Sequence, residues 1–124
     1  MPVIAILGAS TNRGKFGNKA LRAFRANGFT VKTYEVSDVT PYKIRHGITP
    51  ELASCHTALV DGYVLEGHVP AGDIRRLLKE HPRVQGLAVP GMPGGSPGME
   101  QGNNDRYEVL SFDKAGEIKV YSRH

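Results

Sequence analysis

The stretch "TALVDGYVLEGHV", residues 57–69, decides the fold that this sequence predicts. Two apolar runs flank the dipeptide Asp61-Gly62, which suits a two-residue turn of type I′ because both of its residues tolerate positive φ. We therefore predict a β-hairpin here. Two strands in direct succession break the strict alternation of strand and helix that a flavodoxin-like or Rossmann domain requires.

The residues before this hairpin predict a βαβ unit. Residues 3–7, "VIAIL", form a continuous apolar run that is typical of a buried parallel strand. Residues 15–28 carry apolar side chains at helical spacing, and Gly28 is expected to end that helix as its C′ residue. Residues 29–36, "FTVKTYEV", predict a second strand, parallel to the first and reached by a right-handed crossover.

The residues on either side of the central hairpin complete the predicted order. Pro41 and Pro50 suit the first positions of two short helical turns, and residues 70–81 predict an amphipathic helix with an apolar stripe. A short strand "VQGLAV" follows, then a Pro- and Gly-rich loop, then a second hairpin around residues 113–116. The resulting fold class is α/β, with a thioredoxin-like three-layer core of order β-α-β-α-β-β-α, a Rossmann-like N-terminal βα element and a C-terminal β-hairpin.

Length and composition narrow the function classes. The chain has 124 residues, which suits a single domain over 1–124. Its net charge of +4 comes without a block of Lys and Arg, so no nucleic-acid partner is expected. No apolar run approaches the roughly 18 residues of a membrane span. The N-terminus lacks the basic region of a signal peptide, so we expect a soluble protein that is cytoplasmic as expressed.

The first strand, loop and helix start resemble the opening of CoA-binding domains of the Rossmann type. The resemblance covers residues 3–24, "VIAILGASTNRGKFGNKALRAF", and implies a site for the phosphates of CoA or another adenine nucleotide. Glycine lets backbone approach a ligand, and a helix start offers unpaired N–H groups. The candidate binding residues are Gly8, Ala9, Ser10, Asn12, Arg13, Lys15, Phe16, Gly17 and Asn18.

The remainder of the chain resembles a different family, the small metal-binding CopG-type proteins associated with copper resistance. The resemblance rests on residues 48–78, "ITPELASCHTALVDGYVLEGHVPAGDIRRLL", on "GLAVPGMPGGSPGME" and on "YEVLSFDKAGEIKVYSRH". It implies a thioredoxin-like fold, copper handling and a periplasmic parent protein. It also implies that a loop carrying Met92 and Met99 covers the metal site.

This sequence departs from that family at the metal site. The resemblance implies a cysteine-rich motif after the first strand, where this chain has "GASTNRGKFGN" and no cysteine. The remaining candidate ligands are Cys55, His56, Met92 and Met99, whose soft sulfur atoms suit weak binding of Cu(I). In a thioredoxin-like fold the loop before the third strand faces the first helix, so Cys55 is expected near the N-terminal loop.

Two resemblances on one chain lead to the hypothesis of an engineered chimera. In it, residues 1–24 are the CoA-binding-like element and residues 25–124 the CopG-like scaffold. Three functions stay open: a non-catalytic binder of a small phosphate-bearing ligand, a residual copper-binding protein, and a purely structural protein without a ligand. The single cysteine has no partner for an internal disulfide.

The other polar residues predict no catalytic site. His46, His68 and His81 are expected on the surface or in loops, and Asp73 is a candidate for a turn or a helix cap. No Ser-His-Asp or Cys-His-Asp set follows from the sequence, so we expect a protein that is not an enzyme. The terminal hairpin offers an edge strand for a second copy, so the expected state is a monomer or a weak homodimer.

Overall fold

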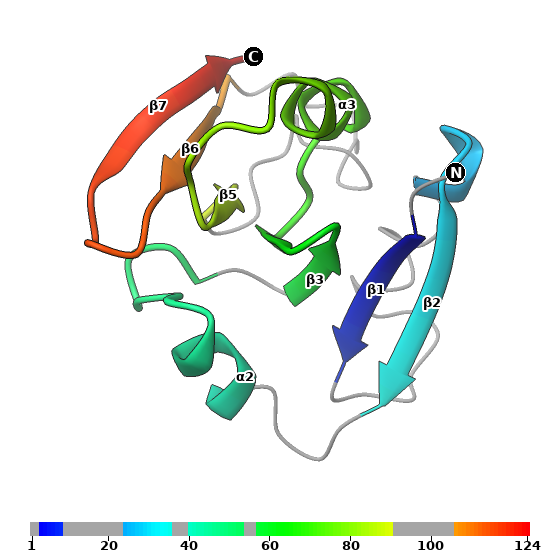
Figure 1. The fold of residues 1–124 in the computed structure, drawn as a ribbon, viewed down its shortest axis with the longest axis horizontal. Coiled ribbons are helices and arrows are strands. Elements are labelled where there is room, and N and C mark those ends of the chain that lie inside the picture. The colour runs from blue at the N-terminus through cyan, green and yellow to red at the C-terminus, as the bar shows by residue number, and fades with distance from the viewer. Residues whose placement is uncertain (1–2, 9–23, 36–39, 54–56, 91–105) are drawn as a thin grey trace.

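A computed structural model describes residues 3–8, 24–35, 40–53, 57–90 and 106–124 of the chain. Its centre is a seven-stranded mixed sheet with strand order β2-β1-β3-β4-β5-β6-β7 (Figure 1). The strands are β1 (Val3–Gly8), β2 (Thr30–Glu35), β3 (Thr57–Val60), β4 (Tyr63–Glu66), β5 (Gly86–Ala88), β6 (Glu108–Phe112) and β7 (Ile118–Arg123). None of the described helices is long and apolar enough to cross a membrane.

The predicted parallel strands at the N-terminus are confirmed. β1 pairs with β2 in parallel, from Val3 opposite Thr30 to Gly8 opposite Glu35. The described end of the helix between them closes as predicted at Gly28, which has φ of 87°. Gly28 N–H donates to the Arg25 carbonyl at 3.0 Å and Phe29 N–H to the Phe24 carbonyl at 3.1 Å, the bonds of a Schellman cap.

The central hairpin has the predicted turn. Asp61 and Gly62 have φ of 48° and 83°, as a type I′ turn requires. β3 pairs with β4 on one side and antiparallel to β1 on the other, so the hairpin joins the N-terminal unit to the remainder of the sheet. This placement confirms that the hairpin interrupts the strand–helix alternation.

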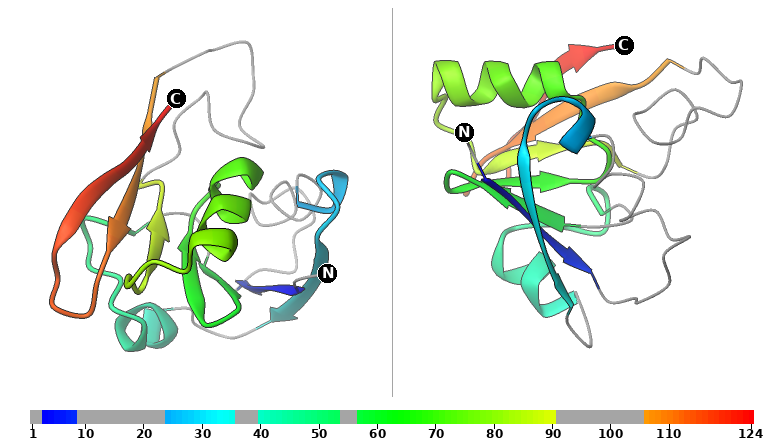
Figure 2. Two further views of the ribbon diagram at one scale, coloured as in Figure 1. Left: turned by 45° about the horizontal axis from the view of Figure 1, so that its top comes forward. Right: turned by 90° about the vertical axis from the view of Figure 1, so that its right-hand side faces the viewer.

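The predicted helices flank the sheet. α2 (Thr40–Arg45) and a separate turn in which Ala53 N–H donates to the Thr49 carbonyl lie on one face. α3 (Ala71–Glu80) lies on the other face, and its stripe residues Ile74 and Leu77 are buried (Figure 2). β5 follows α3 and pairs in parallel with β4.

The C-terminal hairpin is also confirmed. β6 pairs antiparallel with β5 and with β7, and a register shift falls between Val109 and Leu110. The hairpin therefore extends the central sheet and forms no separate layer. β7 is one of the two edge strands of the described sheet, as expected, and Ile118 and Val120 on it are exposed.

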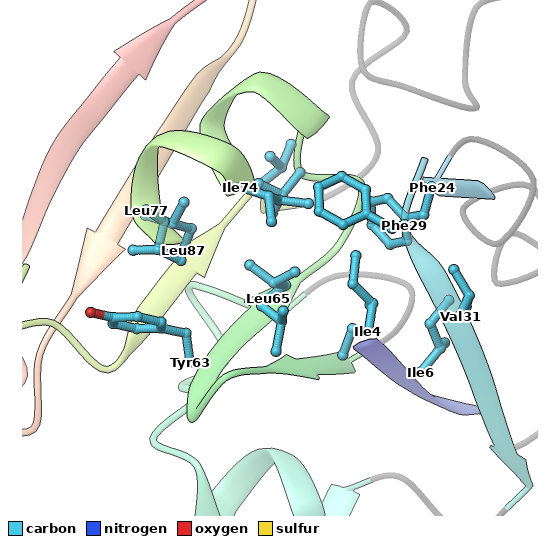
Figure 3. Packing of buried hydrophobic residues seen from close by; sticks show 14 of the residues in the cluster. Ile4, Ile6, Phe24, Phe29, Val31, Tyr63, Leu65, Ile74, Leu77 and Leu87 are labelled. Carbon is cyan, nitrogen blue, oxygen red and sulfur yellow. The ribbon is translucent and has the colours of Figure 1, made fainter. Parts of the chain in front are cut away.

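Apolar side chains fill both faces of the sheet. Ile4, Leu65 and Leu87 point toward Ile74 and Leu77 of α3, and Phe24 and Phe29 close that core beside β2 (Figure 3). On the opposite face Ile48 and Leu52 pack against alternate residues of the strands, which are Val64, Ala88 and Phe112. Alternation along each strand thus supplies two cores from one sheet.

The α/β class and the order of the described elements are therefore as predicted. The narrower thioredoxin-like assignment and the boundary near residue 24 stay predictions.

Two glycines provide a matched test of the packing between β4 and β5. A Cβ on Gly86 would lie 1.9 Å from the Val64 carbonyl oxygen, whereas a Cβ on Gly72 in α3 would meet no atom within 4 Å. We expect Gly86→Ala to lower the free energy of unfolding by about 3 kcal/mol or more, because backbone must move. Gly72→Ala should raise it by about 0.5–1 kcal/mol, because alanine favours the helix. Urea denaturation of both variants checks this, and equal stabilities would contradict the close approach.

Candidate functional site

Most of the predicted site residues lie outside the described part of the chain. Gly8 is described as the last residue of β1. The structure does not describe the other candidates, which are Ala9, Ser10, Asn12, Arg13, Lys15, Phe16, Gly17, Asn18, Cys55, His56, Met92 and Met99. Their contacts stay predictions, and the described residues next to them define the site.

The strands bring these neighbouring residues to one edge of the sheet. A row of register partners runs from Leu7 to Thr57, then to Glu66, and then to Ala88. Leu7 precedes the last residue of β1, Thr57 begins β3, Glu66 ends β4 and Ala88 ends β5. Neighbouring strands lie about 4.8 Å apart, so the row spans only about 15 Å. We call this row the site edge.

The predicted ligands adjoin the site edge in the sequence. His56 directly precedes Thr57, and Met92 follows Ala88 by four residues. The loop with the candidate phosphate-binding residues begins directly after β1. Leu7 and Thr57 are register partners, but the expected proximity of Cys55 to the N-terminal loop lies outside the described residues and stays a prediction.

A buried polar cluster lies at the centre of the site edge. Glu66 and Thr57 both have exposed fractions of 0%. Thr57 Oγ1 donates a hydrogen bond to Glu66 Oε1 at 2.6 Å. Lys43 Nζ, from α2, forms an ion pair with Glu66 Oε2, and the Lys43 side chain is 17% exposed. Both carboxylate oxygens of Glu66 are thus engaged by side chains from two different elements.

Strand alternation determines which face this cluster occupies. Glu66 lies two residues beyond Val64 and therefore points to the same face, where Ile48 and Leu52 pack. α2 and residues 48–53 lie on that face, and Lys43 of α2 forms its ion pair with the carboxylate there. A carboxylate removed from water needs such partners, because its unpaired burial costs several kcal/mol.

The sequence contained only a weak signal for this cluster. Glu66 directly follows the apolar residues Tyr63, Val64 and Leu65 in a predicted strand, an unusual place for a charged residue. Nothing local indicated its partner, since Lys43 lies 23 residues earlier. The apolar runs on either side of Asp61-Gly62 were enough to predict the two strands, but not to predict that all four residues of β4 are buried.

The burial of His68 did not follow from the sequence. His68 lies in the loop after β4, as expected, but its exposed fraction is only 2%, so it is not a surface residue. His68 belongs to the short connection that leads from β4 to α3. His46 is half-buried after α2 and His81 is exposed at the C-terminal cap of α3, which agrees with the expectation for both.

A second polar cluster ties α3 to β7. Asp73 is buried, and its carboxylate accepts from Ser122 Oγ at 2.8 Å and contacts His124 Nε2 at 2.7 Å. The ring of His124 stacks on Tyr107 with centroids 5.1 Å apart. Asp73 is therefore a cross-element anchor. The expected cap role was wrong, since α3 has no side-chain cap hydrogen bond at its start.

This second cluster has the residue types of a catalytic triad but not its geometry. The same atom, His124 Nε2, contacts both Asp73 and Ser122 Oγ, the latter at 3.1 Å. A triad requires the two ring nitrogens to face the carboxylate and the hydroxyl separately, so that the imidazole can move a proton between them. Asp73 also engages Ser122 directly, so the hydroxyl is held by the carboxylate and is not activated by the imidazole.

The described residues alone do not form a metal centre. Within the part of the chain that the structure describes, no group of three or more His, Cys, Asp or Glu side chains is placed to hold a metal ion. Any metal site at this edge therefore needs side chains from the segments that adjoin Thr57 and Ala88.

The ion pair at the site edge gives a stability prediction. Lys43→Met keeps an apolar stem but leaves the Glu66 carboxylate buried without this cation. We therefore expect it to lower the free energy of unfolding by about 3–5 kcal/mol. Adding Glu66→Leu to that variant should recover part of the loss, because the uncompensated charge is gone. Urea denaturation with a double-mutant cycle measures both effects.

Lys119→Met provides the control for this experiment. It removes the exposed pair of Lys119 and Glu117, whose atoms are 3.6 Å apart. Its expected effect is within about 0.5 kcal/mol, because water screens exposed pairs. An equally small effect of Lys43→Met would show that the buried pair adds nothing to stability.

Comparisons with known proteins extend the resemblance found in the sequence. The model of a family described as "Protein of unknown function, DUF411" matches residues 52–99. No curated protein matches the chain. The solved structure titled "Copper resistance protein copG- Form 1" is 36% identical and has a TM-score of 0.89, covering 98% of this chain and 96% of its own. "Form 2" of the same protein is also 36% identical, with a TM-score of 0.91 and coverage of 99% and 98%.

These matches bear on the hypothesis of a chimera. A single kind of protein aligns with nearly the whole chain, including the N-terminal strand, loop and helix that resembled a CoA-binding domain. The comparisons therefore give no support to a splice near residue 24 or to a CoA-binding origin. At this identity and coverage, the chain belongs to the family of CopG copper resistance proteins.

Proposed function

We propose that this protein is a non-catalytic copper-binding protein that holds Cu(I) at the site edge. The observation that carries the proposal is the convergence of the strand ends. Thr57, Glu66 and Ala88 are neighbours across three strands. The segments that carry Cys55, His56 and Met92 adjoin this row in the chain. The copper resistance proteins that are 36% identical over nearly the full length support the choice of metal.

The chemistry of the candidate ligands favours Cu(I) over harder ions. A cysteine thiolate and methionine thioethers are soft donors, and an imidazole is compatible with the same ion. The side chains of Cys55, His56, Met92 and Met99 contain no carboxylate or carbonyl group, the donors that suit magnesium or calcium. The donor set therefore fits a monovalent soft metal, with Cys55 as the only thiolate that the sequence offers.

Because this chain has no cysteine motif after the first strand, its proposed copper site has fewer thiolate ligands. The family resemblance places cysteines where this chain has residues 8–18, "GASTNRGKFGN". One thiolate with thioethers binds fewer Cu(I) ions, and binds them less tightly, than a cluster of bridging thiolates. We propose a site for a single ion rather than a polynuclear cluster.

A Cu(I) competition titration under anaerobic conditions tests this function. Cys55→Ala should lower the affinity for Cu(I) by more than the roughly 10–100-fold that changes around metal ligands cost, because the thiolate is removed outright. His56→Ala should also weaken binding, whereas the matched control His46→Ala should not. Equal Cu(I) affinity of the wild type and Cys55→Ala would reject the proposal.

A phosphate-bearing ligand remains the second candidate function. One described feature favours it: β1 ends at Gly8 and runs parallel to β2, so the loop after Gly8 begins a βα crossover of the kind that binds phosphate at a helix start. Calorimetric titration with CoA, ATP and inorganic phosphate tests it. Binding at millimolar ligand should release heat and raise Tm by mass action, and neither effect would be seen if the loop is only a connection.

We also propose that the protein has no catalytic activity and exists as a monomer or a weak homodimer. The arrangement of Asp73, Ser122 and His124 supports the first point, since it lacks the geometry for proton relay. The exposed edge strand β7 supports the second, since Ile118 and Val120 are available to a second copy.

A further inference from the structure

The buried carboxylate at the site edge is not explained by stability. A buried ion pair is commonly no more stabilising than apolar side chains of the same volume, because both ions lose their hydration. The surroundings of Glu66 already include apolar residues such as Val64 and Ala88, which pack in the same core. An aliphatic side chain at position 66 would continue that core. The position of the carboxylate therefore points to another role.

Glu66 bonds to described residues that lie close in sequence to both segments carrying the proposed copper ligands. Through its side chain it accepts from Thr57 Oγ1 at 2.6 Å, and Thr57 follows Cys55 by two residues. Through its main-chain carbonyl it accepts from Val89 N–H at 2.9 Å, and Val89 precedes Met92 by three residues. One residue thus bonds to the first described residue after the Cys55 segment and to a residue just before the Met92 segment.

Lys43 fixes the orientation of that carboxylate. Its ammonium engages Oε2 while the Thr57 hydroxyl engages Oε1, so rotation about the last side-chain bond of Glu66 would break both contacts. Because Lys43 belongs to α2, the helix also covers the strand ends from that face. These two contacts tie Thr57, at the start of β3, to α2 through the Glu66 carboxylate.

We propose that Glu66, acting through Thr57 and held by Lys43, is the positioning residue of the copper site. This positioning role rests on the proposed copper-binding function. It gives a part in that function to three residues that would not touch the metal. Outer-shell residues of this kind orient ligands and commonly change metal affinity by about 10–100-fold when they are replaced.

Three variants test this proposal. Thr57→Val keeps the shape of the side chain but removes the hydroxyl, Thr57→Ser keeps the hydroxyl, and Glu66→Gln keeps the volume but removes the charge that holds Lys43. Anaerobic Cu(I) competition titration gives the affinity, and X-ray absorption of the loaded protein gives the number of sulfur ligands. Circular dichroism and urea denaturation confirm that each variant is folded.

We expect Thr57→Val and Glu66→Gln to bind Cu(I) at least about tenfold more weakly than the wild type, with fewer sulfur ligands. Thr57→Ser should stay close to the wild type, because its hydroxyl can still reach Glu66. The matched control is Ser122→Ala, which removes a hydroxyl bonded to a different buried carboxylate, Asp73, at 2.8 Å. It should cost stability without changing Cu(I) affinity or ligand number.

The outcomes separate this inference from the function on which it rests. Wild-type affinity and ligand number in folded Thr57→Val and Glu66→Gln, together with weak binding by Cys55→Ala, would overturn the positioning role and leave copper binding intact. Equal losses in Ser122→Ala and Thr57→Val would also overturn it, because they would show an effect of stability alone. No difference between the wild type and Cys55→Ala would reject both proposals. If Thr57→Val does not fold, Glu66→Gln and Thr57→Ser decide the question by the same measurements.

Discussion

The tight turn at Asp61 and Gly62 is the constraint on which the sheet depends. A two-residue type I′ turn fixes the register of β3 against β4 as well as their twist. β3 then pairs with β1 and β4 pairs with β5, so the hairpin joins the N-terminal and C-terminal halves of the sheet. A slip of one residue in this hairpin would turn Thr57 and Glu66 to opposite faces and separate the groups of the site edge.

The same register gives the sheet two different faces. The α3 face is a large apolar core that includes Ile4, Leu65 and Ile74. The opposite face has a smaller apolar core and, at the strand ends, the polar group of Glu66, Thr57 and Lys43. Apolar burial on both faces provides the driving force for folding, so the polar group can serve a different purpose. The proposed copper site lies where the apolar packing ends.

The N-terminal element shows how a local pattern can suggest a function that the whole chain does not support. A strand followed by a glycine and a helix start occurs in phosphate-binding domains and also in many other βα units. Both need a tight turn in which the backbone is not crowded by a side chain. Full-length similarity to copper resistance proteins changes the weight of that pattern. The N-terminal loop without cysteine then belongs to one member of a single family, and the open question is how Cys55, His56, Met92 and Met99 would share an ion.

The sequence by itself determined the elements whose cause is local. The Asp61-Gly62 turn, the cap at Gly28, the stripe of α3 and the last hairpin all follow from residues that lie close together in the chain, because propensity and periodicity act over a few residues. Tertiary structure alone decided that the C-terminal hairpin extends the sheet, that His68 is buried, and that Lys43 meets Glu66 across 23 residues. Such contacts depend on which surfaces the folded elements bring together, and no spacing in the sequence records that geometry.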